Sequence, residues 1–143
     1  MSMMNTVLAT RAGLGLTLLR IPVGIIFMAH GSQKLFGWFG GHGLAGTAQY
    51  MESIGLAPGH LMAMLSGGTE FFGGLALVIG LLVRPAAIGL VGLLLVAIFS
   101  VHINNGLFMS NNGYEFALAL LAGVIAILIE GAGKASLDNL IAD

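Results

Sequence analysis

Residues 61–103 decide the fold: they read LMAMLSGGTEFFGGLALVIGLLVRPAAIGLVGLLLVAIFSVHI and are apolar almost throughout. Their only acidic residue is Glu70. A helix needs about 20 mainly apolar residues to cross a bilayer, so this stretch is long enough for two spans. We therefore predict spanning helices at about 61–83 and 85–103. They are joined by a minimal turn at Arg84, and the proline that follows suits a first helical position.

Two further apolar stretches flank this pair, at about 12–36 and 114–130. The first is too long for the apolar region of a typical signal peptide and contains Arg20, so we interpret it as a retained helix. The second is short for a span and needs its flanking residues or a locally thin membrane. Four such helices use nearly all of the 143 residues. We expect one all-α membrane domain over residues 1–143, a bundle of four transmembrane helices.

The composition supports a lipid environment. Hydrophobic residues make up 57% of the chain, charged residues only 8%, and the mean hydropathy is +1.00. A soluble domain carries roughly 25% charged residues. The absence of cysteine excludes disulfides, thiol redox chemistry and thiolate metal sites, and we expect no metal site. A net charge of −1 gives no reason to expect nucleic acid.

Positive charges indicate the orientation. Four spans place both termini on one side together with Arg11, Arg84 and Lys134, whereas the loop between the third and fourth spans has no Lys or Arg. An excess of positive charge marks the cytoplasmic face. We therefore expect both termini in the cytoplasm. Lys34, near the outer end of the first span, is the exception.

Two short helices are expected outside the spans. The glycine-rich outer loop, residues 37–60, has apolar residues at helical spacing, namely Leu44, Ala48, Met51 and Ile54. This pattern favours a short helix on the outer membrane surface, anchored by Trp38 and Tyr50; an irregular loop is the alternative. Near the end of the chain, Ser136 can cap one more helical turn, residues 137–141.

Small residues recur at helical spacing along the spans, and close contact between membrane helices depends on such residues. The stripe on the second span is Thr69, Gly73, Ala76 and Gly80. The first span carries Gly13, Thr17, Arg20, Gly24, Phe27, Gly31 and Lys34 on one face, and the fourth carries Glu115, Ala119, Ala122, Ala126 and Glu130. Arg20, Lys34 and Glu115 therefore lie on faces that pack, and Glu70 borders such a face. The same stripes also allow a homo-oligomer.

A charge at the bilayer centre costs roughly 2.5–3.5 kcal/mol, so such a residue is normally paired or belongs to a site. We estimate the depth of each residue in the membrane by counting residues at about 1.5 Å each. Arg20 and Glu70 then differ in depth by a distance that an arginine side chain can largely bridge. We predict that these two form a pair. Its role is either to fix the register of two helices or to serve a site.

The remaining polar residues gather in the outer half of the bundle. His30 and Lys34 are one helical turn apart, His102 ends the third span, and Glu115 begins the fourth. With Glu70 beneath them, we expect one polar pocket covered by the outer loop. Each residue also has a structural interpretation. The histidines could bond a backbone group or water, Glu115 could stabilise the helix dipole, and Lys34 could reach the interface.

Three motifs resemble those of the DoxX family, within the wider DoxX/DoxD-like group. Residues 14–138 carry them, in this order: Arg20, Gly24, Phe27 and His30-Gly-x-x-Lys34; then Glu70-Phe-Phe-Gly-Gly, Gly80-Leu81, Arg84 and Ala86-Ala87; then Gly131-Ala-Gly-Lys-Ala-Ser-Leu-Asp138. The resemblance implies a four-helix protein of the bacterial inner membrane with a link to redox metabolism. Relatives of this kind include the membrane subunit of a thiosulfate:quinone oxidoreductase and proteins that accompany oxidative-stress and thiol-handling partners.

We therefore expect a membrane subunit, rather than a complete enzyme, that binds a quinone or similar lipid-soluble molecule in the outer pocket. Glu70 would exchange protons and Lys34 would stabilise reduced oxygen, while an aromatic ring such as Phe27, Phe36 or Trp38 would line the quinone. The other expected binding residues are Arg20, His30, His102 and Glu115. The resemblance matches Arg20, Lys34 and Glu70, and spacing adds His102 and Glu115. Electrons would come from a partner redox protein.

Other functions remain open. The chain could be a scaffold or assembly protein whose buried charges only hold the bundle. A small transporter is disfavoured because no internal duplication is visible. A haem held between His30 and His102 is a further alternative.

Overall fold

The computed structural model describes residues 3 and 14–142. Within them the chain is helical, with no strand. The longer helices are α2 (Leu14–Phe36), α3 (Gly43–Ser53), α4 (Gly59–Ile79), α5 (Val83–Ala97), α6 (Glu115–Glu130) and α7 (Leu137–Ala142). Arg11 and the predicted start of the first span lie outside the described residues.

Three helical stretches are long and apolar enough to cross a membrane: Leu14–Phe36, Gly59–Ile79 and Val83–Asn105. The last comprises α5, a π-helical turn at Ile98–His102 and a 3₁₀ turn at Ile103–Asn105. These stretches confirm an all-helical membrane protein. The fourth span stays a prediction, because α6 has 16 residues, which reach about 24 Å, short of a hydrocarbon core of about 30 Å.

The α4–α5 turn comes earlier than predicted. Gly80 has φ = 76° and follows the last residue of α4, so it terminates the helix in the left-handed conformation that favours glycine. The sequence interpretation had placed this glycine inside a packing stripe. The two short helices outside the spans do form: α3 lies in the predicted outer loop, and Ser136 Oγ accepts a hydrogen bond from the Asn139 amide at 3.1 Å to cap α7. The location of α3 at a membrane surface stays a prediction.

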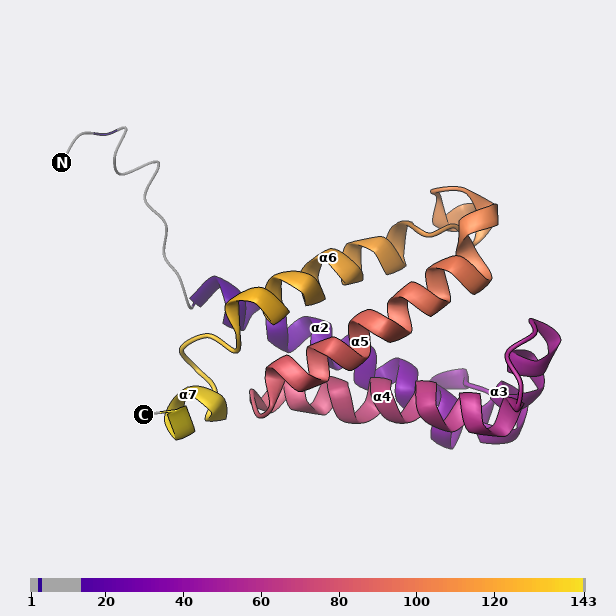
Figure 1. Ribbon diagram of the computed structural model, residues 1–143, viewed down its shortest axis with the longest axis horizontal. Helices are drawn as coiled ribbons and strands as arrows, with labels where there is room; N and C mark the ends of the chain where they lie inside the picture. Colours follow the sequence, from indigo (N-terminus) through magenta and orange to yellow (C-terminus); the bar gives the residue numbers. More distant parts are fainter. Residues whose placement is uncertain (1–2, 4–13, 143) are drawn as a thin grey trace.

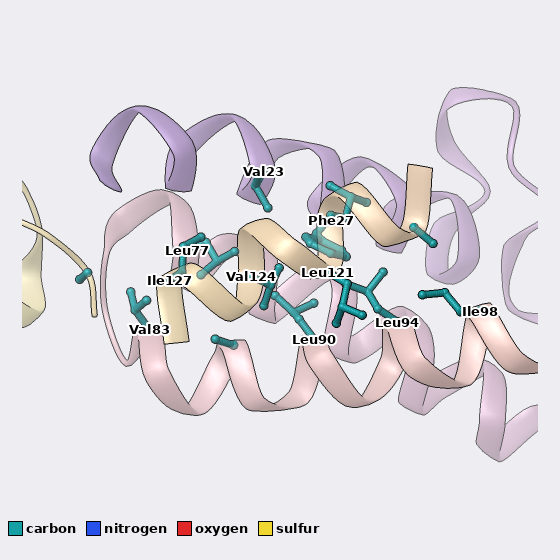
Figure 2. Packing of buried hydrophobic residues seen from close by; sticks show 14 residues of the cluster. Val23, Phe27, Leu77, Val83, Leu90, Leu94, Ile98, Leu121, Val124 and Ile127 are labelled. Atoms are coloured by element: carbon teal, nitrogen blue, oxygen red, sulfur yellow. The ribbon is translucent and has the colours of Figure 1, made fainter. Parts of the chain in front are cut away.

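The bundle consists of two helix pairs, α2 with α4 and α5 with α6. In Figure 1 the pairs approach each other near the α4–α5 turn and diverge toward the end that carries α3. The apolar core fills the closer part of this arrangement (Figure 2). Its fully buried members include Phe27, Leu77, Leu90, Val124 and Ile127. The core thus holds one end of the pairs together and leaves the other end apart.

Glycines bring α2 and α4 into backbone contact. A Cβ atom added at Gly31 would lie 2.5 Å from the Phe71 amide nitrogen, and one added at Gly74 would lie 2.6 Å from the Gly24 carbonyl oxygen. The predicted small-residue face of α2 therefore does pack. On α4 the sequence interpretation identified the face of Gly73, which contacts α5, and missed the Gly67–Gly74 face that contacts α2.

Candidate functional site

A cavity of about 900 Å³ lies where the two helix pairs diverge. Residues of α2, α3, α4, α5 and α6 line it, so all the long helices of the bundle contribute. Its walls are mainly apolar, and α3 covers part of it with Tyr50 and Met51. Four of the predicted site residues line this cavity, namely His30, Lys34, Glu70 and His102. The volume falls within the range of small-molecule sites.

Lys34 and Glu70 form an ion pair in which Lys34 Nζ donates to Glu70 Oε1. The Glu70 side chain is 6% exposed and that of Lys34 is 28% exposed. Gly67, one turn before Glu70, makes this approach possible, because a Cβ atom there would lie 3.2 Å from Lys34 Cβ. The second oxygen, Glu70 Oε2, makes no hydrogen bond within residues 14–142. The carboxylate therefore retains an acceptor beside the cavity.

Hydrogen bonds orient the rings of both predicted site histidines. His30 Nδ1 lies 2.9 Å from the Ile26 carbonyl oxygen, and His102 Nδ1 lies 2.9 Å from the Asn112 carbonyl oxygen. A carbonyl oxygen only accepts, so each Nδ1 donates this hydrogen bond, and Nε2 is the ring nitrogen left for another partner. The His30 ring also lies against Phe116 of α6, with centroids 6.1 Å apart. Both rings are held in place by atoms other than their Nε2.

The predicted pair between Arg20 and Glu70 is wrong. Arg20 is fully buried, and its guanidinium donates to the carbonyl oxygens of Leu77 at 2.5 Å and Ala135 at 2.6 Å, with a longer bond to Val78 at 3.3 Å. The last carbonyl groups of a helix have no partner within it, and Arg20 satisfies those of α4. Arg20 and Lys34 are fourteen positions apart, about 21 Å along α2. Glu70 can meet only one of them.

Three further predicted residues do not line the cavity. Trp38 is 55% exposed and its ring packs on Phe36, with centroids 4.7 Å apart. Glu115 stands in the first turn of α6, the place where an acid stabilises the helix dipole. Arg20 belongs to the opposite end of the bundle. Of the aromatic residues expected around a ring, Phe27 lines the cavity, whereas Phe36 and Trp38 do not.

Sequence reasoning missed several polar residues of this cavity. Ser66 and Thr69 of α4 line it beside Glu70, and so do His42 and Thr47 near α3. Ser66 precedes Glu70 by one helical turn, so its spacing was a usable signal. Nothing in the sequence pattern placed His42 near the membrane helices. Within the described part of the chain, no three His, Asp or Glu side chains come close enough to hold a metal ion.

The far end of the bundle carries a second polar cluster with different chemistry. The Asp138 carboxylate accepts the amides of Leu82 at 2.7 Å and Val83 at 2.9 Å, at the start of α5. Arg84 donates to the carbonyl oxygens of Leu128 and Ile129, both at 3.1 Å, at the end of α6. These contacts satisfy helix-end backbone groups. The Asp138 contacts tie the C-terminal segment to the start of α5, and the Arg84 contacts tie α5 to the end of α6.

Comparison with known proteins identifies relatives along nearly the full chain. The family described as DoxX matches residues 15–103. "Inner membrane protein YqjF" of Escherichia coli (strain K12) is 33% identical over 133 residues, covering 89% of this chain and 92% of the relative. "Putative oxidoreductase CatD" of Bacillus subtilis (strain 168) is 32% identical over 125 residues, covering 87% and 85%. An "Uncharacterized protein" of Haemophilus influenzae is 30% identical over 131 residues, covering 91% and 85%. No solved structure matches the chain.

Proposed function

The chain belongs to the DoxX family and is a multi-pass protein of the bacterial inner membrane; from this premise we propose that it binds a quinone as the membrane subunit of an oxidoreductase or oxidative-stress system. One observation carries the proposal: a large apolar cavity between membrane helices contains a buried carboxylate paired with a lysine. A charge inside a membrane bundle is expensive and commonly marks a functional site. A quinone needs both an apolar space and protonatable groups near its oxygens.

The residues at the cavity have the chemistry that quinone reduction requires. The ring takes up a pair of electrons and a pair of protons to become a quinol. Both protons come from water; the Glu70 carboxylate takes up each in turn and releases it to the ring, while Lys34 donates a hydrogen bond to the oxygen that gains negative charge. His30 and His102 offer Nε2 acceptors to the quinol hydroxyls. Phe27 supplies an aromatic wall to the ring.

The electrons come from a partner protein. The chain has no cysteine to hold an iron–sulfur cluster, so the protein acts as a subunit that brings the quinone to a redox partner. The relative named "Putative oxidoreductase CatD" supports this assignment.

In this proposal α6 is the fourth span, running beside α5 with its outer end at Glu115. Both termini then lie in the cytoplasm with Arg84 and Lys134. The cavity opens in the outer half of the membrane, and α3 lies over it at the outer surface. Lipid surrounds the bundle, since large apolar side chains such as Leu18, Phe72 and Phe99 are more than 60% exposed.

A scaffold function is the second candidate, and the polar cluster around Arg20 favours it. Those side chains are engaged with backbone groups and serve only to hold helices together. If Lys34 and Glu70 have the same role, the cavity binds nothing specific and the protein docks its partners through its loops. Ligand analysis separates the two functions.

The test is organic extraction and mass spectrometry of the protein purified with native lipid. Three forms are compared: wild type, Glu70→Gln, and Glu115→Gln as a matched control at a carboxylate outside the cavity. We expect a near-stoichiometric quinone in wild type and in the control, and its loss from Glu70→Gln. Bulk phospholipid alone in all three would refute quinone binding and leave the scaffold function.

A further inference from the structure

The contact between α4 and α5 changes abruptly along the two helices. Near the α4–α5 turn they touch: a Cβ atom added at Gly73 would lie 3.2 Å from Leu90 Cγ, and one added at Gly89 would lie 3.3 Å from Thr69 Cγ2. One turn further along α5, a Cβ atom added at Gly92 would meet no atom within 4 Å. The contact between α4 and α5 thus reaches Gly89 and Thr69, and the space beside Gly92, one turn further along α5, is open.

Beyond this contact lies a slot between α4 and α5, which leads sideways out of the cavity. Its walls are Leu65 and Thr69 on α4 and Gly92 and Val96 on α5, all of which line the cavity. Leu65 is 55% exposed and Val96 is 50% exposed, so the same side chains face both the cavity and the outside of the bundle. In a membrane the outside at this depth is lipid. The cavity is thus connected with the hydrocarbon core through the α4–α5 slot.

Side chains stand at the other sides of the cavity. Between α2 and α6 the rings of His30 and Phe116 lie against each other across the gap. At the end of the cavity, Tyr50 and Met51 of α3 contribute to the lining. The α4–α5 slot differs from both, since its α5 wall includes Gly92, a residue without a side chain.

We propose that the α4–α5 slot is the exit through which the polyprenyl tail of the bound quinone passes from the cavity into the bilayer. This inference rests on the proposed function. Thr69 is adjacent to Glu70 in sequence, so the slot begins at the level of the carboxylate that would hold the ring. Lipid tails are as apolar as protein side chains, so a tail gains little by staying inside. It requires an unobstructed path, which Gly92 provides.

The experiment introduces a side chain into that path. Gly92→Phe fills the slot without striking a neighbour at its Cβ atom, and it removes a glycine from a helix interior, so the fold is retained. Gly68→Phe is the matched control: it is a glycine of α4 that also has open space at its Cβ position and does not line the cavity. Proteins are reconstituted in nanodiscs of phosphatidylethanolamine and phosphatidylglycerol.

Two probes distinguish the contribution of the tail to binding from that of the ring. One is a benzoquinone with a long polyprenyl tail, and the other is the same ring with a methyl group in place of the tail. Binding is measured by competition against the radiolabelled methyl compound. We expect Gly92→Phe to weaken binding of the tailed compound by about tenfold or more, because the tail would be forced against a packed side chain. The affinity for the methyl compound should be unchanged. Gly68→Phe should alter neither.

The outcomes distinguish the inference from its premise. Equal weakening of both probes by Gly92→Phe, or no weakening of the tailed probe, would overturn the exit path while leaving quinone binding intact. Failure of the methyl compound to bind wild type would refute the proposed function, and the exit path with it.

Discussion

Replacing Gly31 with alanine should destabilise the bundle, although alanine is the better helix former. A Cβ atom at this position would lie 2.5 Å from the Phe71 nitrogen and 2.8 Å from the Gly67 carbonyl oxygen. Both are backbone atoms of α4 and cannot rotate away, so α2 and α4 must move apart. Overpacking of this kind costs about 1–3 kcal/mol, and the gain from helix propensity returns at most about 1 kcal/mol. With the full gain subtracted, the net loss is up to about 2 kcal/mol.

The assay is reversible unfolding in mixed micelles with increasing sodium dodecyl sulfate, followed by the fluorescence of Trp38, the single tryptophan of the chain. Gly68→Ala is the control, because the added methyl group has nothing within 4 Å, and we expect it to stabilise the protein by up to about 1 kcal/mol. The two variants should therefore change the free energy of unfolding in opposite directions. A Gly31→Ala protein as stable as Gly68→Ala would refute backbone contact between α2 and α4.

Two further predictions concern the ion pair and the orientation. Lys34→Met leaves the Glu70 carboxylate buried without its partner, and we expect the free energy of unfolding to fall by about 3–5 kcal/mol in the same assay. The double variant Lys34→Met with Glu70→Leu should recover most of this loss. A double variant no more stable than the single one would contradict the pairing. Because the chain lacks cysteine, single cysteines at Asn111 and Lys134 can report orientation. A membrane-impermeant maleimide should label Asn111→Cys in intact spheroplasts and Lys134→Cys only after lysis. Labelling of both variants in intact spheroplasts would refute the prediction that α6 crosses the membrane between these two positions.

Sequence patterns predicted those features that depend on a few neighbouring residues. Apolar length identified α2, α4 and the stretch Val83–Asn105 that begins with α5, since each is long enough to cross a bilayer. Helical spacing in the outer loop predicted α3, and the cap at Ser136 followed from its hydroxyl and position. Burial of Glu70 followed from its place in an apolar helix. Each of these inferences required no knowledge of which helix lies beside which.

The partner of Glu70 could not be predicted in the same way. Counting residues from the membrane surface estimates the depth of a Cα atom, but the tilt and rotation of each helix decide which side chains meet. Here the Gly31–Phe71 and Gly67–Lys34 contacts set the rotation of α2 against α4, and this rotation brings Lys34 to Glu70. The predicted pair of Glu70 with Arg20 rested on depth alone, and depth does not determine this rotation.

The two ends of the bundle use polar residues differently, and this difference supports a binding function at one end only. Near the α4–α5 turn, Arg20, Arg84 and Asp138 give their hydrogen bonds to backbone groups at helix ends. At the cavity, Lys34 and Glu70 meet between helix interiors, where the backbone is already satisfied by the helices. If charge served only to fasten helices, the first arrangement would suffice, and the core could continue between the diverging pairs. A bundle that leaves about 900 Å³ open beside a buried carboxylate forgoes apolar packing that membrane helices need for association, and a ligand that fills this space restores it.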